Sequence, residues 1–324
     1  MKPSGIGGQA VLEGVMMKNR DTYAVAVRKP NNDIEVQTKN YKGITEKFKF
    51  FQLPFIRGIF NFIDSLVLGL SSLTISASFA EDDVEENKIA DDLADKAFKE
   101  KGEAVMMGLT ILFSLVIAIA LFMLLPFFLS SLIDKHLNIV STTFLAVVEG
   151  LIRIGIFVGY IFLISRMKDI QRTFMYHGAE HKCINCIENG MNLTVDNVMK
   201  SSKVHKRCGT SFIFLVLFIS IILYIFIRVD SFGLKILIRV ILIPVIAGIS
   251  YEIIRWAGRS NSLLVRIVSK PGLLMQSLTT KEPEDKMVEV AIKSVEAVFD
   301  WRKFLAGADA KDCAIEAQVA ENEG

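Results

Sequence analysis

Cysteine is scarce in this sequence, and so is net charge. Four Cys among 324 residues cannot staple a fold of this length, which excludes a disulfide scaffold. Lys and Arg total 37 against 35 Asp and Glu, so the net charge of +2 gives no reason to expect a nucleic-acid partner. The first residues lack the apolar run of a signal peptide, and we therefore expect no cleavable export signal.

Apolar residues, by contrast, are abundant. They make up 52% of the chain, Phe alone contributes 23 residues, and the mean hydropathy is +0.42. A disordered chain would lack these apolar residues, and a typical soluble domain has fewer of them. The composition therefore indicates a membrane protein with membrane lipids as partners.

Four uninterrupted apolar stretches are long enough to cross about 30 Å of hydrocarbon. They cover residues 105–133, 142–165, 209–229 and 232–254. The second stretch carries Glu149 and Arg153, which stand four residues apart and can pair on one helical face. We interpret these charges as structural pairs or as groups that reach the interface, with a transport path as the alternative. The same interpretation applies to Lys235, Arg239 and Glu252 in the fourth stretch.

The predicted fold class is mainly α: a polytopic membrane protein with about four transmembrane helices, a small N-terminal β element and cytoplasmic amphipathic helices. Alternating apolar residues around a Pro-Asn-Asn-Asp turn predict a β-hairpin over 22–39. Residues 48–79 are apolar but interrupted by Pro54 and Arg57, which favours an amphipathic or re-entrant helix, with a fifth span as the alternative. Helical spacing of apolar residues predicts another helix from Pro283.

These elements divide the chain into six predicted segments. The segments are 1–47 with the β-hairpin, 48–104 with the amphipathic or re-entrant helix and an acidic linker at 81–86, 105–165 with the first two transmembrane helices, 166–208 as a His/Cys loop, 209–256 with the last two transmembrane helices, and 257–324 with the C-terminal helix and a tail disordered from 307.

Basic residues indicate the orientation in the membrane. Lys and Arg cluster in 166–208, whereas the connections 134–141 and 229–232 carry little charge. Short basic loops are retained in the cytoplasm, so we expect residues 166–208 and both termini there. In that reducing compartment Cys183 and Cys186 are expected to be thiols, and we interpret them as packing or redox-sensitive residues, with an accessory metal role as the alternative.

The predicted His/Cys loop holds three of the four His residues. His177, Glu180 and His181 fit the pattern H-x-x-E-H, in which two His four residues apart on a helix can bind one metal ion. His205 and Cys208 follow three residues apart and can return to the same ion. Imidazoles with a thiolate suit Zn²⁺ or another divalent transition metal. The alternative is that these groups are interfacial polar residues that cap helix ends.

Six segments together resemble a known family. They are GGQAVLEGVMM (7–17), PFIRG (54–58), YHGAEHK (176–182), HKRCGTSF (205–212), PVIAGISYE (244–252) and LTTKEP (278–283). They are similar to the YqhQ-like family of uncharacterised bacterial membrane proteins, the domain of unknown function numbered 1385. The resemblance implies an integral protein of the bacterial inner membrane that is predicted to be a metal-dependent enzyme. It places the metal suggestion on His177, Glu180, His181, His205 and Cys208, with Glu13 as a further catalytic candidate.

Two classes of function follow from these patterns. In the first, the chain is a zinc-dependent hydrolase at the membrane interface, and Glu180 is the general base. In the second, His177, His181, His205 and Cys208 complete the coordination of a structural metal, which clamps the loop in a scaffold, lipid-handling or transport protein. We favour the hydrolase; neither pattern indicates a substrate.

Overall fold

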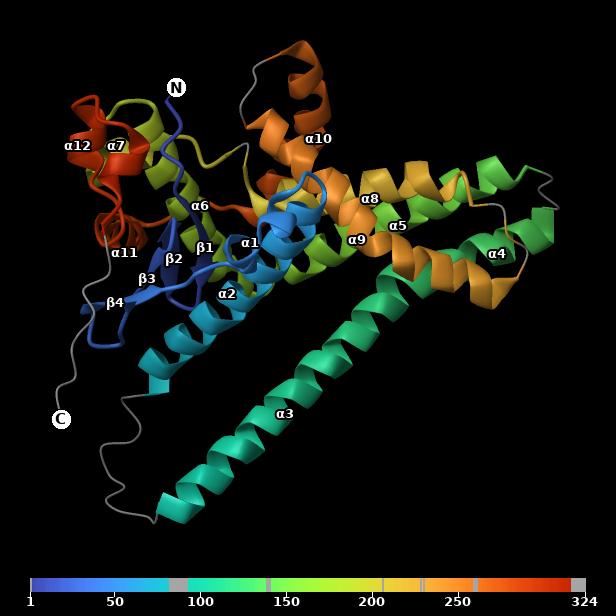
Figure 1. The fold of residues 1–324 in the computed structure, drawn as a ribbon, viewed down its shortest axis with the longest axis horizontal. Helices are drawn as coiled ribbons and strands as arrows, with labels where there is room; N and C mark the ends of the chain where they lie inside the picture. The colour runs from blue at the N-terminus through green and yellow to red at the C-terminus, as the bar shows by residue number, and fades with distance from the viewer. Residues whose placement is uncertain are drawn as a thin grey trace. The chain divides into compact units, whose positions relative to one another are not determined.

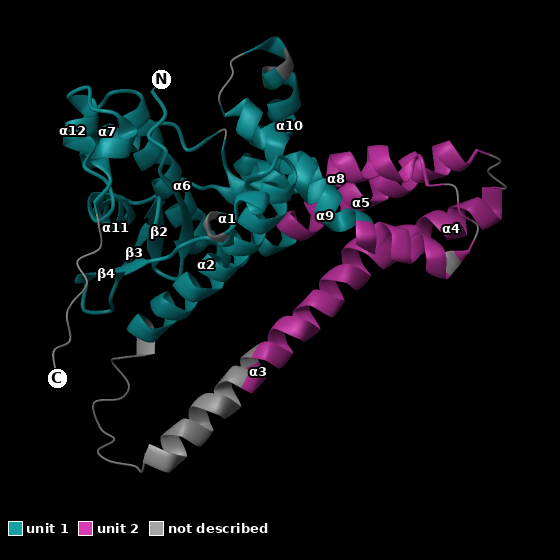
Figure 2. Cartoon of the chain, in the orientation of Figure 1, with its two compact units in different colours: residues 1–81, 163–216, 242–324 teal, residues 82–162, 217–241 magenta. Residues whose placement is uncertain are grey.

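The computed structural model describes residues 2–81, 93–137, 141–205, 207–227, 229, 231–258 and 262–315. It confirms a mainly helical chain with one small N-terminal sheet (Figure 1). Figure 2 shows that the chain forms two compact units, of which unit 1 comprises residues 1–81, 163–216 and 242–324, and unit 2 comprises 82–162 and 217–241.

Four antiparallel strands form the sheet in sequence order. They are β1 (Gly7–Val11), β2 (Gly14–Asn19), β3 (Thr22–Arg28) and β4 (Ile34–Asn40). The β3–β4 pair is the hairpin predicted over 22–39, but β1 and β2 are additional strands. Most of β2 is buried, so apolar residues fall on both of its faces and the alternation that predicts a strand is absent.

Helices cover both faces of this sheet in unit 1 (Figure 1). One face packs against α2 (Ile56–Glu81), and the other packs against α6 (Lys168–Glu188) and α11 (Asp285–Glu296). Successive side chains of β2 point to opposite faces of the sheet, so Met16 packs on the face covered by α2 and Met17 packs on the face covered by α6 and α11. The N-terminal sheet, the helix of the His/Cys loop and the C-terminal helix therefore share one core.

The C-terminal region is more ordered than predicted. The structure confirms the helix expected after Pro283 as α11. The tail expected to be disordered from 307 is instead packed as far as 315, because Cys313 is only 1% exposed and Phe299 pairs with Ala314 in a β-bridge. Residues 316–324, and the acidic linker beyond Glu81, lie outside the described residues.

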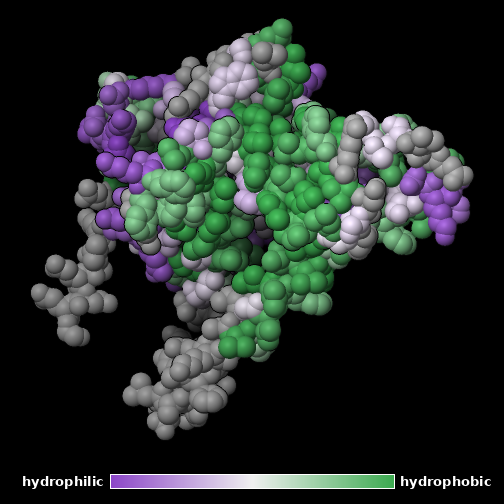
Figure 3. Space-filling view, turned by 45° about the vertical axis from the view of Figure 1, so that its right-hand side comes forward, coloured by the Kyte–Doolittle hydropathy of each residue, from purple (hydrophilic) through white to green (hydrophobic). Residues whose placement is uncertain are grey.

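Four helical stretches in the described part of the chain are long and apolar enough to cross a membrane. They are Ile56–Phe79, Gly108–Leu137, Thr142–Ile164 and Gly233–Ala257. The number of candidate spans agrees with the prediction of about four. One member differs, because Ile56–Phe79 is among the candidates and the predicted stretch 209–229 is not. The helix in that region, α8 (Gly209–Tyr224), has 16 residues and is about 24 Å long. The outer surface of the long helices is mostly apolar in Figure 3.

The remaining elements include both long helices and short connecting turns. They are α1 (Ile44–Lys47), a 3₁₀ turn (Lys49–Gln52), α3 (Leu93–Ile119) joined through a π-helical turn (Ala120–Leu124) to α4 (Leu125–Leu137), α5 (Thr142–Ile164), α7 (Val195–Lys200), α9 (Phe232–Ala257), α10 (Leu263–Thr279), α12 (Trp301–Leu305) and a 3₁₀ turn (Ala310–Cys313).

The start of α2 packs closely against α9. A Cβ on Gly58 would lie 3.0 Å from Gly248 Cα, and a Cβ on Gly248 would lie 2.7 Å from Phe55 O, so both positions require glycine. Beside this crossing, Arg57 donates two hydrogen bonds to the Glu252 carboxylate, at 2.6 and 2.5 Å. The segments 54–58 and 244–252 therefore form one helix contact.

Candidate metal centre

The two histidines of the H-x-x-E-H pattern lie on one face of α6. Their ring centroids are 4.4 Å apart, as expected for residues one helical turn apart. Apolar side chains on the other faces of α6, such as Tyr176, Ala179 and Ile184, pack into the core shared with the sheet and α11. This packing fixes the helix and buries His181 to 1% exposure.

A close backbone approach brings the segment after α10 against α6. A Cβ on Gly178 would lie 2.0 Å from Lys281 O, so only glycine fits at this position. The Lys281 N–H donates to Phe174 O at 2.9 Å and fixes the contact. The contact places the end of α10 beside His177.

Main-chain carbonyl groups orient both imidazoles. His177 Nδ1 lies 2.9 Å from Thr279 O, and His181 Nδ1 lies 2.7 Å from Lys203 O. A carbonyl oxygen only accepts, so each Nδ1 carries a proton, and in the neutral imidazole each Nε2 keeps a free electron pair. Metal-binding histidines commonly have this arrangement, because the partner on one nitrogen orients the other toward the ion.

Cys208 supplies a third potential ligand from the residue before α8. Its Sγ is 3.3 Å from His177 Nε2, and the Thr210 N–H donates to it at 3.4 Å. The ligand atoms of His177, His181 and Cys208 all lie within 4.8 Å of one another. Two ligand atoms of one tetrahedral zinc are about 3.4–3.6 Å apart, so a small contraction would place all three around one ion.

Glu180 lies at the same site. Its side chain is buried, with a residue exposure of 4%, and its Oε2 is 3.4 Å from His181 Nε2. Gly8 of β1 leaves space for this carboxylate, because a Cβ there would lie 3.0 Å from Glu180 Cγ. The acidic group of the motif therefore faces the nitrogen that would hold a metal.

His205 lies beside the three ligands but is not one of the group. Its ring centroid is 5.7 Å from that of His181, and its Nε2 faces Glu188 Oε2 at 3.8 Å. Gln276 holds the His205 main chain by accepting from its N–H at 2.9 Å and donating to its carbonyl at 2.7 Å. The structure thus brings together three of the four predicted metal ligands.

The carboxylate beside His205 is strongly stabilised in its charged form. Burial alone would raise the pKa of Glu188, but the nearby His205 ring, the positive charge of Arg207 and the hydrogen bonds from Arg207 and the Ser4 N–H outweigh that effect and hold the pKa at about 2. A permanent negative charge facing Nε2 fixes the orientation of the His205 ring.

Glu13, the further catalytic candidate, pairs with Arg172. Arg172 donates to both of its carboxylate oxygens at 2.6 Å, and the Tyr176 hydroxyl lies 3.4 Å from one of them. Arg172 is five residues before His177 on α6, and Glu13 occupies the turn between β1 and β2 with a φ of 49°. In this structure Glu13 therefore anchors that turn to α6.

The Cys183 and Cys186 thiols are core residues. Both are fully buried among the apolar side chains between the sheet, α6 and α11. Burial raises the pKa of each thiol, which keeps it protonated and unreactive. Packing is therefore the interpretation that this environment favours.

Several groups around the site were missed by the sequence analysis. Gln276 and the carbonyl groups of Lys203 and Thr279 orient histidines from distant parts of the chain. The segment 278–283 carried a signal because it contributes to the family resemblance, although its residue types indicate no chemistry. Main-chain carbonyl groups that orient a histidine have no sequence signature, because every residue carries one.

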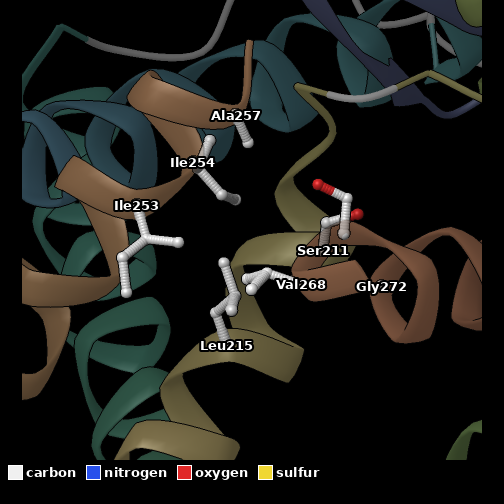
Figure 4. Close-up of a pocket in the computed structure, with 8 residues that line it drawn as sticks. Ser211, Leu215, Ile253, Ile254, Ala257, Val268 and Gly272 are labelled. Carbon is white, nitrogen blue, oxygen red and sulfur yellow. The ribbon is translucent and has the colours of Figure 1, made fainter. Parts of the chain in front are cut away.

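A small apolar pocket lies one turn of α8 beyond Cys208 (Figure 4). Leu215, Ile253, Ile254, Ala257 and Val268 line most of it. Ser211 is its polar edge and accepts a hydrogen bond from Gln276 Nε2 at 3.0 Å. Ser211 therefore links the pocket to Gln276, which in turn holds the His205 main chain.

Comparison with known proteins places these features in a family. Residues 53–301 match the family described as "Protein of unknown function (DUF1385)". The chain is 34% identical over 295 residues to "Uncharacterized protein YqhQ" of Bacillus subtilis (strain 168), covering 90% of this chain and 91% of that protein. No solved structure matches the chain. The chain therefore belongs to the DUF1385 family, and residues 177, 181 and 208 of the candidate metal centre fall within the matched region.

Proposed function

We propose that this membrane protein is a zinc-dependent hydrolase that acts at the membrane interface. His177, His181 and Cys208 would hold the metal, and Glu180 would be the general base. The observation that carries the proposal is the convergence of three ligand atoms within 4.8 Å, two of them on imidazoles whose other nitrogen is held by a carbonyl group.

The number of ligands favours catalysis over a structural role. Structural zinc sites have four protein ligands, whereas catalytic sites have three and an open position. A bound Zn²⁺ would supply a Lewis acid that polarises a carbonyl or phosphoryl oxygen and acidifies water. Glu180 Oε2, close to His181 Nε2, is placed to accept the proton that an attacking water releases and to return it to the leaving group.

The competing function is a structural clamp with His205 as the fourth ligand. Its support is the short distance between the His181 and His205 rings. His205 offers neither ring nitrogen within 4.8 Å of all three ligand atoms, so the clamp would require its side chain to move toward them from its place beside Glu188. For that reason we favour the hydrolase.

Packing in unit 1 supports a cytoplasmic site. The sheet, α6 and α11 share one core, so they lie on one side of the membrane, and the chain between them must cross an even number of times. Leu68 and Ile75 of α2 pack on the sheet, so we assign α2 to the membrane interface.

The helices that cross the membrane in pairs are then the α3–α4 stretch with α5, and α8 with α9. The apolar residues 225–227 would extend the short α8. The basic residues of 166–208 favour a cytoplasmic location for the shared core.

Metal analysis and complementation together test the proposal. We expect the purified protein to contain one zinc per chain, as measured by inductively coupled plasma mass spectrometry. His177→Ala should lose the metal, whereas Glu180→Gln should retain metal and thermal stability but fail to complement a deletion strain. Full complementation by Glu180→Gln would contradict the general base. Absence of metal from the wild-type protein, purified without chelators, would contradict the whole site.

A further inference from the structure

A second group of charges is buried within unit 2. Glu149 and Arg153 belong to α5 and Arg239 to α9, and none of the three is more than 5% exposed. The two Glu149 oxygens accept one hydrogen bond each, from Arg153 Nη2 and Arg239 Nη2, both at 2.7 Å. One carboxylate thus pairs with two guanidinium groups, so the cluster of these three side chains carries one excess positive charge.

The other partners of the two arginines are neutral. Arg153 donates to Phe122 O at 3.0 Å and to Ser220 Oγ at 3.1 Å. Each guanidinium carbon also lies 4.9 Å from the centroid of the Tyr224 ring. Carbonyl groups, hydroxyls and aromatic faces attract a cation, but they do not cancel its charge.

A third cation lies next to this cluster. Lys235 precedes Arg239 by four residues on α9, and both side chains lie over the Phe127 ring, at 5.5 and 5.0 Å from its centroid. Arg239 Nε is buried without a hydrogen-bond partner in the described part of the chain. An ammonium group and an unused guanidinium N–H therefore lie over one aromatic ring.

We propose that Lys235 and Arg239 bind a phosphate-type oxyanion. An uncompensated charge within membrane-spanning helices is unfavourable unless it meets a counter-charge. The guanidinium fork matches the oxygens of a phosphate group, and an ammonium group adds a second point of attraction. The ligand is either a phospholipid headgroup or free phosphate, because Lys235 lies near the start of α9, where headgroups are within reach.

Thermal unfolding of the purified full-length protein in neutral detergent tests the proposal. One arm adds inorganic phosphate, with sodium chloride at equal ionic strength as its control. The other adds phosphatidylglycerol, with phosphatidylcholine as its control. We expect a saturable rise in Tm in at least one arm. A response to phosphatidylglycerol alone identifies a lipid headgroup, and a response to phosphate identifies the free ion.

Charge variants show whether the response comes from this cluster. Arg239→Gln leaves the neutral Glu149–Arg153 pair and should weaken oxyanion affinity at least about tenfold. Lys235→Ala, at a half-buried position, should also weaken it and is available if Arg239→Gln does not fold. Lys135→Gln removes an exposed cation elsewhere in unit 2 and should respond like the wild type. An absent response, an equal response to the controls, or an unchanged response in both cluster variants would overturn the proposal.

Discussion

At the scale of residues, chemically similar side chains in this protein have different environments. Cys208 lies beside an imidazole, whereas Cys183 lies in an apolar core. Glu180 faces a candidate ligand nitrogen, whereas both oxygens of Glu13 accept hydrogen bonds from Arg172. Local environment, rather than residue type, therefore separates the candidate site from its surroundings.

The two cysteines provide a matched test of metal binding. Cys208→Ser should reduce zinc content to a small fraction of one ion per chain, because a hydroxyl is a far weaker zinc ligand than a thiolate. Cys183→Ser should keep the zinc but lower Tm, since it buries a hydroxyl among apolar side chains. Equal zinc contents in the two variants would argue against Cys208 as a ligand.

The depressed pKa of Glu188 predicts a pH-dependent contribution to stability. The carboxyl titrates near 4.5 in the unfolded chain and at about 2 in the folded chain, so its stabilisation is complete above pH 4.5 and is lost as pH falls toward 2. Glu188→Gln should cost about 3 kcal/mol at pH 7, and the difference from wild type should shrink between pH 4.5 and 2. Unfolding at several pH values measures this, with the half-exposed Glu289→Gln as a control that stays near wild type.

At the scale of elements, close backbone contacts position the candidate site. The approach of Lys281 to Gly178 holds the end of α10 against α6, and Gly58 with Gly248 holds α2 against α9. Such contacts tolerate no Cβ and therefore fix the relative positions of the helices.

Substitution at one of these glycines should affect the site through the backbone. Gly178→Ala would force the Lys281 carbonyl away and weaken the Thr279–His177 hydrogen bond. We expect a loss of about 2–3 kcal/mol in stability and a fall of about tenfold or more in zinc affinity. Gly155→Ala, on α5 with nothing within 4 Å of the added Cβ, is the control. Zinc affinity that stays at the wild-type level in Gly178→Ala would show that this contact does not position His177.

At the scale of the whole molecule, the shared core of unit 1 constrains the membrane topology. Segments near both ends of the chain and the helix α6 pack together. We therefore expect these three remote parts of the sequence on one side of the membrane.

Cysteine labelling in intact cells tests this topology. A reagent that cannot cross the membrane should leave Asn31→Cys, Asn192→Cys and Arg302→Cys unmodified, because they lie in the sheet turn, after α6 and in α12. It should modify Lys135→Cys at the end of α4. The four native cysteines are buried, so their background is low. Modification of any of the first three positions would contradict the cytoplasmic assignment.

The sequence alone determined the features that depend on local periodicity. Composition indicated the membrane, helical spacing placed His177 and His181 on one face, and the turn residues predicted the β3–β4 hairpin. The backbone geometry of a helix or hairpin sets these relations within a few residues, so they can be predicted without knowledge of the fold.

The tertiary structure decided which distant residues join the site. Cys208 reaches His177 from 31 residues away, and Thr279 reaches it from 102. Glu13 is paired with Arg172, and His205 lies beside the three ligands with its Nε2 facing Glu188; the roles expected for both residues stay predictions. Core packing among the sheet, α6 and α11 determines these pairings, and no short window of sequence reports how remote elements pack.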